Sequence, residues 1–279
     1  MDLLIESQGV KTKLSDLGLF LIDFDDKSPS IEHDRKTIKN RNGYKPSKSY
    51  FRAKTMRVTA NLLASSLYSF EEKKDEINAL LVTQLPFYVT KLLPTKELYD
   101  FELPGQKTGF SLKEIPTKEY KHRYEVFLNN EIDYNFIGKT NQGLLYSVSF
   151  NLVTDSLPFG QTKPVNEVLT GNLINYSGTQ DCSQLEWPWV IKLTATEAST
   201  GQFYFSIGNE RFEYKSDATI KLNDVFLLKG FENTLNGISV NHKTNYKHFV
   251  LLSTPTKKIS YSTNFKGKIE LINKVELYK

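Results

Sequence analysis

The feature that most limits how this chain can fold is a series of short apolar–polar segments, separated by turn signals, that fills its second half. Each segment alternates with a period close to two residues, as a strand with one buried face does. The segments are residues 187–196, 201–214, 220–231, 237–242, 247–253 and 266–279. Six strands in succession without a helical pattern predict a β-sandwich, and the absence of a repeat of fixed length argues against propellers and solenoids.

The composition agrees with a mainly β fold that has a sizeable core. Hydrophobic residues make up 39% of the 279 residues, with 18 Phe and 15 Tyr among the aromatic ones. Aromatic and β-branched side chains favour strands, and a chain of this length is long enough for two domains. Gly208-Asn209, between Ile207 and Glu210-Arg211, predicts a tight hairpin.

The first half of the sequence predicts several strands. Alternating segments lie at 17–24, 86–93, 122–128 and 143–154, and Asn129-Asn130 is a plausible turn after the third of them. The first half is therefore expected to be a β-domain as well.

One helix is predicted from Ser69 to about Val82. Ser69 and Glu72 fit a capping box, in which the two side chains satisfy free backbone amides at the start of a helix. At helical spacing, Phe70, Ile77, Leu80 and Leu81 share one face, and Glu71, Glu72, Lys73, Lys74 and Asp75 share the other.

A domain boundary is predicted at residues 157–166, which contain two prolines and a glycine. The predicted domains are residues 1–158, with the helix, and residues 165–279, the sandwich.

Residues 31–63 form an unusually polar segment. The turn signals Asn42-Gly43 and Pro46 lie near its centre, and its flanks alternate with a period of two, so we expect a long two-stranded ribbon. From Arg35 to Arg57 the sequence has nine basic residues and no acidic one. Isolated ribbons are only marginally stable in water, so this one is expected to lie on another surface.

Three interpretations of this basic ribbon remain open. Because Tyr44, Tyr50 and Phe51 lie among the basic residues, the ribbon could bind nucleic acid through phosphate contacts and stacking. It could instead be an arm that docks on an acidic neighbouring subunit, or a solvated hairpin without a partner. We favour the docking arm.

The sharpest catalytic candidate is Asp23-Phe24-Asp25, an Asp-x-Asp sequence at the end of an apolar strand. Phosphatases of the haloacid dehalogenase type begin in this way, with one Asp as nucleophile, the other as acid–base and a magnesium ion beside them. That chemistry needs a parallel sheet, whereas a basic ribbon follows here in place of a crossover helix. We therefore interpret the two residues as a solvated turn, and predict that the protein is not an enzyme.

No metal or cofactor site is predicted. The four histidines lack ligand spacing, and His33 beside Glu32 and Asp34 fits a charged turn better than a cation site. Cys182 is the single cysteine, which excludes an intrachain disulfide, and we expect it to be a small buried residue.

Trp187-Pro188-Trp189 lies on a predicted sandwich strand and could be an aromatic shelf for a sugar. Alternation along a strand puts both rings on one face only if Pro188 marks a bulge. At least one of the two tryptophans is therefore expected in the core.

The net charge of +4 is only mildly basic and does not by itself mark a nucleic-acid-binding protein. The N-terminus lacks a signal-peptide pattern, and no apolar run approaches the roughly 18 residues of a membrane span. We expect a protein that is made in a cytoplasm and does not enter membranes.

The order of these parts resembles the distal tail proteins of long-tailed, non-contractile phages, in particular those of Gram-positive, staphylococcal-type hosts. The first domain closes with an apolar strand followed by Pro-Phe-Gly, at 148–160, as is common in that family. The second has Asn-Tyr-Ser-Gly-Thr at 175–179 and a Pro-led strand at 188–191. The turn at 222–224 has Asn where the family often has Gly, and 261–265 keeps the family's Asn without its Pro-Gly.

This resemblance implies a structural protein of the virion, at the tail tip or baseplate. The first domain would be tail-tube-like and would form a ring, and its arm would reach a neighbouring protomer. The ring would be a hexamer that joins the major tail tube protein to the tail-associated lysin or tip protein and to receptor-binding or baseplate proteins. The second domain would be a galectin-like or carbohydrate-binding-module-like sandwich on the periphery.

The residues expected at the interface between subunits are those of the arm: Arg35, Lys36, Lys39, Arg41, Tyr44, Lys48, Tyr50, Phe51, Arg52, Lys54 and Arg57. DNA would pass through the ring without being recognised by sequence. The alternative function is a carbohydrate-binding module that attaches to host cell-wall glycan.

Overall fold

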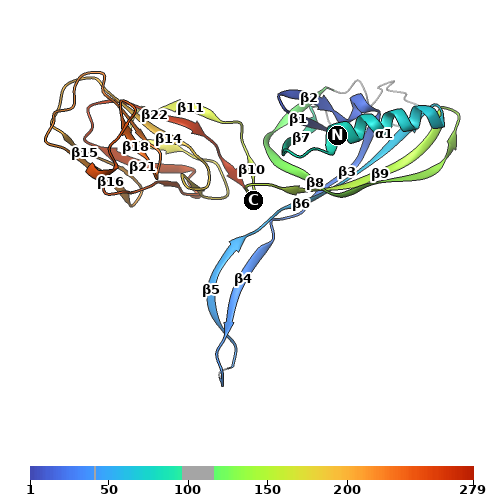
Figure 1. Ribbon diagram of the computed structural model, residues 1–279, viewed down its shortest axis with the longest axis horizontal. Coiled ribbons are helices and arrows are strands. Elements are labelled where there is room, and N and C mark those ends of the chain that lie inside the picture. Colours follow the sequence, from blue (N-terminus) through green and yellow to red (C-terminus); the bar gives the residue numbers. More distant parts are fainter. Residues whose placement is uncertain (41, 96–115) are drawn as a thin grey trace. The chain divides into compact units, whose positions relative to one another are not determined.

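The computed structural model describes residues 1–40, 42–95 and 116–279, which form two compact units, Met1–Gly160 and Gln161–Lys279. Both units are built mainly of β-strands, as the sequence predicts, and the described residues contain one α-helix (Figure 1). None of these residues belongs to a helix that is long and apolar enough to cross a membrane.

The N-terminal unit is centred on one antiparallel sheet, with the strand order β2-β1-β7-β8-β9-β6-β3. The strands are β1 Asp2–Ser7, β2 Val10–Lys13, β3 Leu19–Asp26, β6 Thr55–Ala64, β7 Phe87–Pro94, β8 Thr117–Thr140 and β9 Gly143–Thr154. A short 3-10 helix, η1 Leu14–Leu17, precedes β3 and buries Leu14. The strands predicted at 17–24, 86–93 and 143–154 are thus present as β3, β7 and β9.

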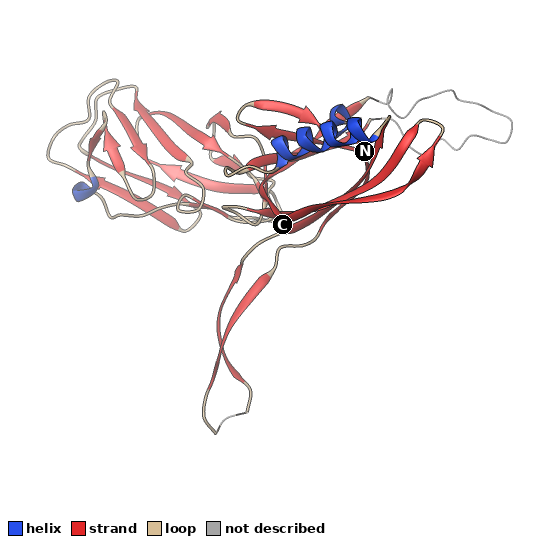
Figure 2. Cartoon of the chain, turned by 45° about the vertical axis from the view of Figure 1, so that its right-hand side comes forward, coloured by secondary structure: helices blue, strands red, loops and turns tan. Residues whose placement is uncertain are grey.

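One face of this sheet is apolar and buried, whereas the other is polar and open. Met56, Val58, Ala60 and Leu62 alternate along β6 with residues that are exposed or half-buried. β9 repeats the pattern in register, with Val58 opposite Phe150. The helix α1, Leu67–Leu81, lies over the buried face and contributes to the same core (Figure 2).

The helix begins three residues before the predicted cap. Ser66 is the N-cap, and its hydroxyl oxygen accepts a hydrogen bond from the backbone N–H of Ser69 at 3.1 Å. The prediction of Ser69 as the cap was wrong. Ser69 lies in the first turn of the helix, where a serine is tolerated and where its backbone N–H is satisfied by the Ser66 side chain. The predicted apolar face is buried at Phe70, Ile77 and Leu81.

β8 differs most from the sequence prediction. It was expected to end near residue 128 with a turn at Asn129-Asn130, but it continues to Thr140. Three residues of β8, 130–132, lie opposite a single residue of β9. At this position Asn130 has a left-handed backbone conformation, with a φ of 75°. The asparagines that predicted a turn therefore lie at a β-bulge inside the strand.

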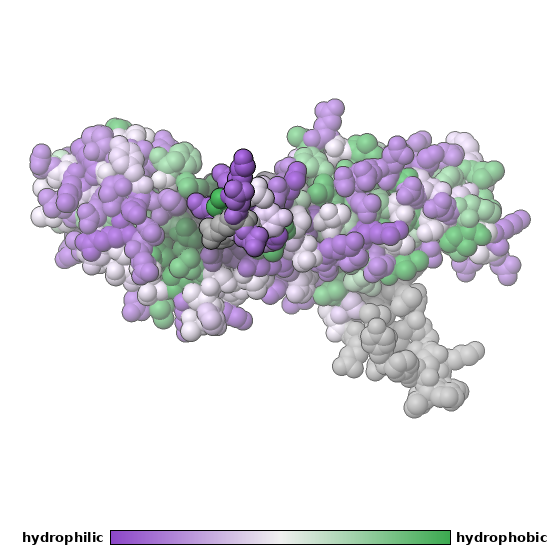
Figure 3. All heavy atoms as spheres, turned by 90° about the horizontal axis from the view of Figure 1, so that it is seen from below, coloured by the Kyte–Doolittle hydropathy of each residue, from purple (hydrophilic) through white to green (hydrophobic). Residues whose placement is uncertain are grey.

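The ribbon consists of β4, Ile31–Thr37, and β5, Tyr44–Phe51, which among the described strands pair only with each other (Figure 1). Every residue of β4 is exposed. The predicted extent, 31–63, was too long because the alternating apolar residues of β6 belong to the sheet. The ribbon's visible surface is mostly hydrophilic (Figure 3).

The C-terminal unit is a sandwich of two antiparallel sheets, as predicted. One has the order β11-β22-β14-β17-β18-β19 and the other β12-β21-β15-β16. The first sheet comprises β11 Val165–Val168, β22 Gly267–Lys274, β14 Val190–Ala195, β17 Val225–Leu228, β18 Asn233–Leu235 and β19 Ile238–Ser239. The second comprises β12 Leu173–Asn175, β21 Lys258–Thr263, β15 Gln202–Ile207 and β16 Glu210–Lys215.

Short elements complete the description: β10 Gly160–Gln161, β13 Cys182–Ser183, β20 Val250–Leu251, β23 Leu277–Tyr278 and the 3-10 helix η2 Asn241–Lys243. The two sheets of the sandwich meet through aromatic rings. Phe203 of β15 packs edge-on against Phe226 of β17, with ring centroids 4.9 Å apart. The predicted hairpin at Gly208-Asn209 joins β15 to β16.

Candidate functional site

The ribbon and its base carry most of the residues that the sequence singles out. Arg35 and Lys36 lie on β4, Lys39 lies in the turn, and Tyr44, Lys48, Tyr50 and Phe51 lie on β5. Arg52 and Lys54 lie between β5 and β6, Arg57 lies on β6, and Arg41 falls outside the described residues. The structure thus separates a ribbon proper from a base that belongs to the N-terminal unit.

The outer part of the ribbon concentrates positive charge. Lys36 and Lys45 occupy directly opposite positions on the two strands. Like charges opposite one another destabilise a two-stranded ribbon. In the part of the chain that the structure describes, neither of them forms an ion pair. The tip therefore carries charge that its own fold does not neutralise.

Aromatic side chains accompany this charge. Tyr44 is 61% exposed, and the guanidinium of Arg35 lies 5.6 Å from the centre of its ring. Tyr50 is also exposed, but its hydroxyl is engaged by the Glu32 carboxylate on the opposite strand. Of the two, Tyr44 is the ring that faces solvent without a hydrogen-bonded neighbour among the described residues.

The base of the ribbon is tied to the N-terminal unit. The backbone of Ser30 bonds to Arg52 and Ala53 across the ribbon at 2.9 and 2.8 Å. The ring of Phe51 packs edge-on against Phe159 at 5.3 Å. Arg52 forms an ion pair with Glu32 at 3.2 Å, but both side chains are exposed, so the pair stabilises little.

Lys54 is a correction to the predicted interface, because it is buried. Only 3% of it is exposed, and its ammonium lies 3.9 Å from Oδ2 of Asp26 and 4.8 Å from the centre of the Tyr124 ring. Burial lowers the pKa of Lys54, although Asp26 opposes this. Lys54 therefore acts inside its own subunit.

Asp26 is the centre of this buried group. Lys91 donates to its Oδ1 at 2.8 Å, and the Tyr124 hydroxyl donates to its Oδ2 at 3.0 Å. Burial raises the pKa of Asp26, but the bond and charge of Lys91, with help from Tyr124 and Lys54, outweigh it and leave the pKa below its usual value. Asp26 ends β3 and Lys54 precedes β6, so this group holds together the two chain segments that lead into and out of the ribbon.

The group extends to His122, whose Nε2 lies 3.1 Å from the Tyr124 hydroxyl. Burial, followed by the charge of Lys121, lowers the pKa of His122 to about 4. The ring is therefore neutral at physiological pH. A Cβ atom at Gly160 would lie 2.5 Å from this ring, so the close approach of the backbone requires glycine.

The sequence contains a signal for the buried lysine. Lys54 has the same parity as Met56, Val58 and Ala60, which face the core. The position in the alternation therefore predicts an inward side chain, whereas counting charges alone assigns it to the surface. No local pattern in the sequence identifies Lys91, Tyr124 and His122 as members of this buried group, because they lie on other strands.

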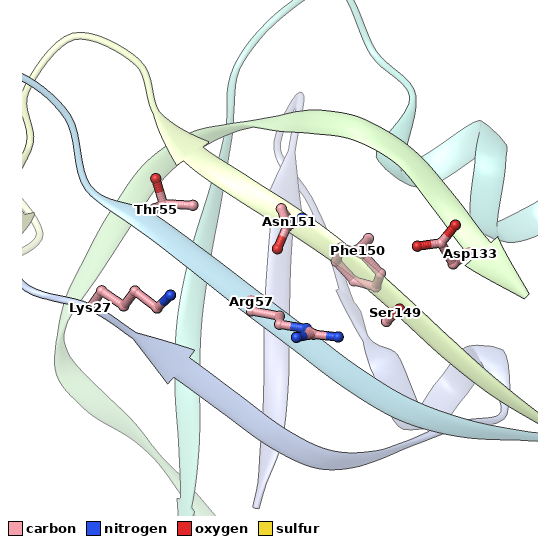
Figure 4. Close-up of a pocket in the computed structure, with 7 residues that line it drawn as sticks. All are labelled: Lys27, Thr55, Arg57, Asp133, Ser149, Phe150 and Asn151. Atoms are coloured by element: carbon pink, nitrogen blue, oxygen red, sulfur yellow. The ribbon is translucent and has the colours of Figure 1, made fainter.

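The phosphatase interpretation of Asp23 and Asp25 finds no support in the topology. Both side chains are exposed on β3, and the sheet is antiparallel, whereas that chemistry needs a parallel one. Asp25 lies opposite Arg57, on the polar face of the sheet. A shallow pocket on this face is lined by Lys27, Thr55, Arg57, Asp133, Ser149, Phe150 and Asn151 (Figure 4).

The remaining candidates of the sequence have structural roles or no site. His33 Nδ1 lies 2.7 Å from the Ser49 hydroxyl. In the described ranges, no three His, Cys, Asp or Glu side chains converge as a metal site would require. Cys182 is fully buried, and burial raises its pKa to about 12, so it is not a reactive thiol.

The two tryptophans do not form a shared shelf. Trp189 is fully buried, as expected for a sandwich tryptophan, and its indole N–H donates to the Cys182 carbonyl at 3.3 Å. Trp187 is half-buried and donates to the Asn273 carbonyl at 2.9 Å. The sequence predicted a strand that starts at Trp187, but β14 begins only at Val190. Both tryptophans therefore lie before the strand.

Comparison with known structures identifies the fold. The crystal structure of the Dit protein (gp 19.1) of phage SPP1, described as a paradigm of the hub adsorption apparatus of phages that infect Gram-positive bacteria, matches with a TM-score of 0.64. The match has 10% identity and covers 98% of each chain. Two structures of the phage P2 baseplate in its activated conformation, with Ca and with Sr, give TM-scores of only 0.40 and 0.38 at 6% and 8% identity. They cover 99% of this chain and 97% and 96% of theirs, but such scores carry no argument about fold.

Sequence comparison gives the family. No curated protein matches the sequence. The family described as phage tail protein RIFT-related domain matches residues 7–149, more than half of the 279-residue chain. The matched residues include the ribbon, its base and α1, so the candidate site lies within the domain that defines the family. The chain belongs to this family of phage tail proteins.

Proposed function

We propose that the protein is the distal tail protein of a long, non-contractile phage tail and that it forms a ring, most simply of six copies. The ring joins the tail tube to the proteins of the tail tip. Membership of the phage tail family and a fold shared with the SPP1 Dit protein support this proposal. The role is structural and needs no catalytic group.

The observation that carries the proposal is the unsupported ribbon. Within the part of the chain that the structure describes, β4 and β5 pair only with each other, and every residue of β4 is exposed. A two-stranded ribbon is marginally stable in water on its own. In a closed ring each copy offers the same surface to the next, so each ribbon finds a partner and each partner surface finds a ribbon.

The two units have different roles in this proposal. The unit Met1–Gly160 forms the ring, and the unit Gln161–Lys279 lies at its periphery. Partners above and below are the major tail tube protein, the tail-associated lysin or tip protein, and receptor-binding or baseplate proteins. Assembly takes place in the host cytoplasm, without membranes or sequence-specific binding of nucleic acid.

The interface residues fall into two groups. Arg35, Lys36, Lys39, Tyr44 and Lys48 belong to the outer ribbon and contact the neighbour. Tyr50, Phe51 and Arg52 lie at the ribbon base, and Lys54 positions the base from within. Arg57 lies on the open sheet face and contacts the neighbour only if that face is also covered.

The test is the mass of the protein in solution, with and without the ribbon. Native mass spectrometry or light scattering of the full chain, over a range of concentrations, is expected to show a hexamer. A variant in which a short Gly-Ser turn joins Ser30 to Arg52 removes β4 and β5 but keeps the backbone bonds of the base.

The ribbon-deleted variant is expected to remain folded and monomeric. Its circular dichroism and its urea midpoint, compared with those of the full chain, check the fold. A full-length chain that stays monomeric under all conditions, including with tube protein present, contradicts the ring. A ribbon-deleted chain that still forms hexamers contradicts the role of the ribbon alone.

A further inference from the structure

A groove lies between α1 and the bulged part of β8. It is lined by Lys74, Asn78 and Val82 from the helix side and by Leu128, Asn130, Glu131, Ile132 and Tyr134 from β8. Val82, Leu128 and Ile132 are its apolar lining residues, and the others are polar. The bulge produces the groove, because it turns residues 130–132 away from the ladder with β9.

Tyr134 lines this groove and packs against the helix. Its ring packs edge-on against Phe70 of the helix at 5.8 Å, and the Lys74 ammonium lies 5.9 Å from the ring centre. The hydroxyl oxygen is buried and has no hydrogen-bond partner in the described part of the chain. Burial raises the pKa of Tyr134 to about 12. Because this oxygen has almost no accessible surface, a side chain that docks in the groove does not reach it.

The surface around the groove is acidic. Glu131 lines it, and Asp75 lies on α1 beside Lys74. Of the helix acids, Glu71 pairs with Lys74 at 3.4 Å. Asp75 and Glu131 form no ion pair within the described residues. This surface therefore has negative charge in excess.

The tip of the ribbon has the complementary properties. Tyr44 is its most exposed aromatic ring, and Arg35, Lys36 and Lys45 surround it with positive charge. A tyrosine offers both an apolar ring and a hydroxyl, which is why it is common where one surface must fill a pocket and satisfy a polar group. The apolar lining residues of the groove and the carboxylates of Glu131 and Asp75 are complementary to the ring and the cations of the tip.

We propose that the ribbon tip of a second copy docks in this groove, with its Tyr44 ring against Val82, Leu128 and Ile132 and its cations against Glu131 and Asp75. The proposal rests on the ring function and names the surface of the neighbour that receives the ribbon. Nucleic acid does not fit this groove, because the acidic surface around it repels phosphate.

Cross-linking in the full chain tests the contact directly. Thr37 lies opposite Tyr44 in the ribbon, so Thr37→Cys places a thiol next to the docked ring and leaves Tyr44 in place. Asn78→Cys supplies the second thiol on the groove wall. The native Cys182 is buried and the chain has no other cysteine, so a short bismaleimide reports on the introduced pair.

The matched control is Thr37→Cys with Glu76→Cys. Glu76 lies on the same helix, two residues from Asn78, and is exposed but does not line the groove. Denaturing gels are expected to show a ladder of covalent multimers for the Asn78 pair and only background for the Glu76 pair. Rings that give no ladder, or equal ladders for both pairs, overturn the docking site and leave the ring intact. Absence of rings overturns the ring and the docking site together.

Tyrosine variants test the chemistry of the contact. Tyr44→Ser is expected to raise the concentration for half-assembly at least tenfold, whereas Tyr50→Ser changes it less than threefold. If Tyr44→Ser leaves assembly unchanged and abolishes binding to a DNA duplex, the tip binds nucleic acid and the proposal is wrong.

Discussion

The buried ion group at the ribbon base allows a stability prediction that depends on which partner is removed. Asp26→Asn leaves Lys54 and Lys91 facing each other with no carboxylate between them. Removing one partner of a buried pair costs about 3–5 kcal/mol. Because Asp26 is about a quarter exposed and Lys91 is 22% exposed, we expect the lower part of that range, about 3 kcal/mol.

Lys54→Met is expected to behave differently. Methionine has a similar length and carries no charge, so it removes the cost of burying an ammonium group. It also removes the contact with the Tyr124 ring at 4.8 Å, which stabilises by about 0.5–2 kcal/mol. Asp26 keeps its bonds to Lys91 and Tyr124. The two effects oppose each other, and the free energy of unfolding is expected to change by about 1 kcal/mol or less.

The pH dependence gives an independent check on Asp26. Its pKa is lowered in the folded state, so its contribution to stability is present above the ordinary carboxyl pKa and is lost as the pH falls through the lowered value. Asp26→Asn removes this contribution, and the loss of stability below about pH 4 should become less steep.

Urea unfolding of the wild type and both variants, at pH 7 and at a series of acidic values, measures these effects. Arg52→Gln is the control, because its ion pair with Glu32 is exposed and its removal should cost about 0.5 kcal/mol or less. If Lys54→Met destabilises as much as Asp26→Asn, the group is not organised around the carboxylate and the reasoning fails.

Three further predictions concern the ribbon, the β8–β9 turn and the linker. Lys36→Glu with Lys45→Glu is expected to weaken ring assembly by native mass spectrometry while leaving the monomer as stable in urea, because one like-charged pair replaces another; intact rings would contradict it. Gly143→Ala should lower stability by about 2 kcal/mol or more in thermal melts, because Gly143 has a φ of 138° and a Cβ there would lie 2.3 Å from the Ala64 carbonyl oxygen; an unchanged melting temperature would refute this. Limited proteolysis is expected to cut within 158–166 and leave a folded C-terminal fragment, and loss of both halves at the same rate would count against that boundary.

Strands with strict alternation were predictable from the sequence, and irregular ones were not. The bounds of β9 agree with the predicted 143–154, because buried and half-buried residues alternate from Leu145 to Thr154. β8 was predicted as a short strand because residues 130–132 interrupt its alternation. From the sequence alone, two adjacent asparagines fit a turn as well as a bulge, and only the pairing with β9 distinguishes the two.

The base of the ribbon shows a second limit. Charge counting placed Lys54 in a surface arm, although its parity with Met56 and Val58 pointed inward. A buried lysine needs partners, and here they come from β3, β7 and β8, which are far apart in the sequence. No local pattern could have revealed them. The groove at Tyr134 is hidden for the same reason, since α1 and β8 meet only in the folded chain.

The charge of the ribbon tip makes the two states of the protein respond to salt in opposite directions. In the free subunit, Lys36 and Lys45 repel each other across the ribbon, so added salt should screen that repulsion and protect the ribbon amides from hydrogen exchange. In the ring, the same cations face an acidic neighbour, so added salt should weaken assembly. A solvated hairpin without a partner has only the first response, and hydrogen exchange combined with native mass spectrometry from low to high salt distinguishes the two cases. The repulsion between these lysines lowers the stability of the free subunit, and we explain it by the attraction that the same charges provide in the ring. A salt response of the same sign in both states would refute that explanation.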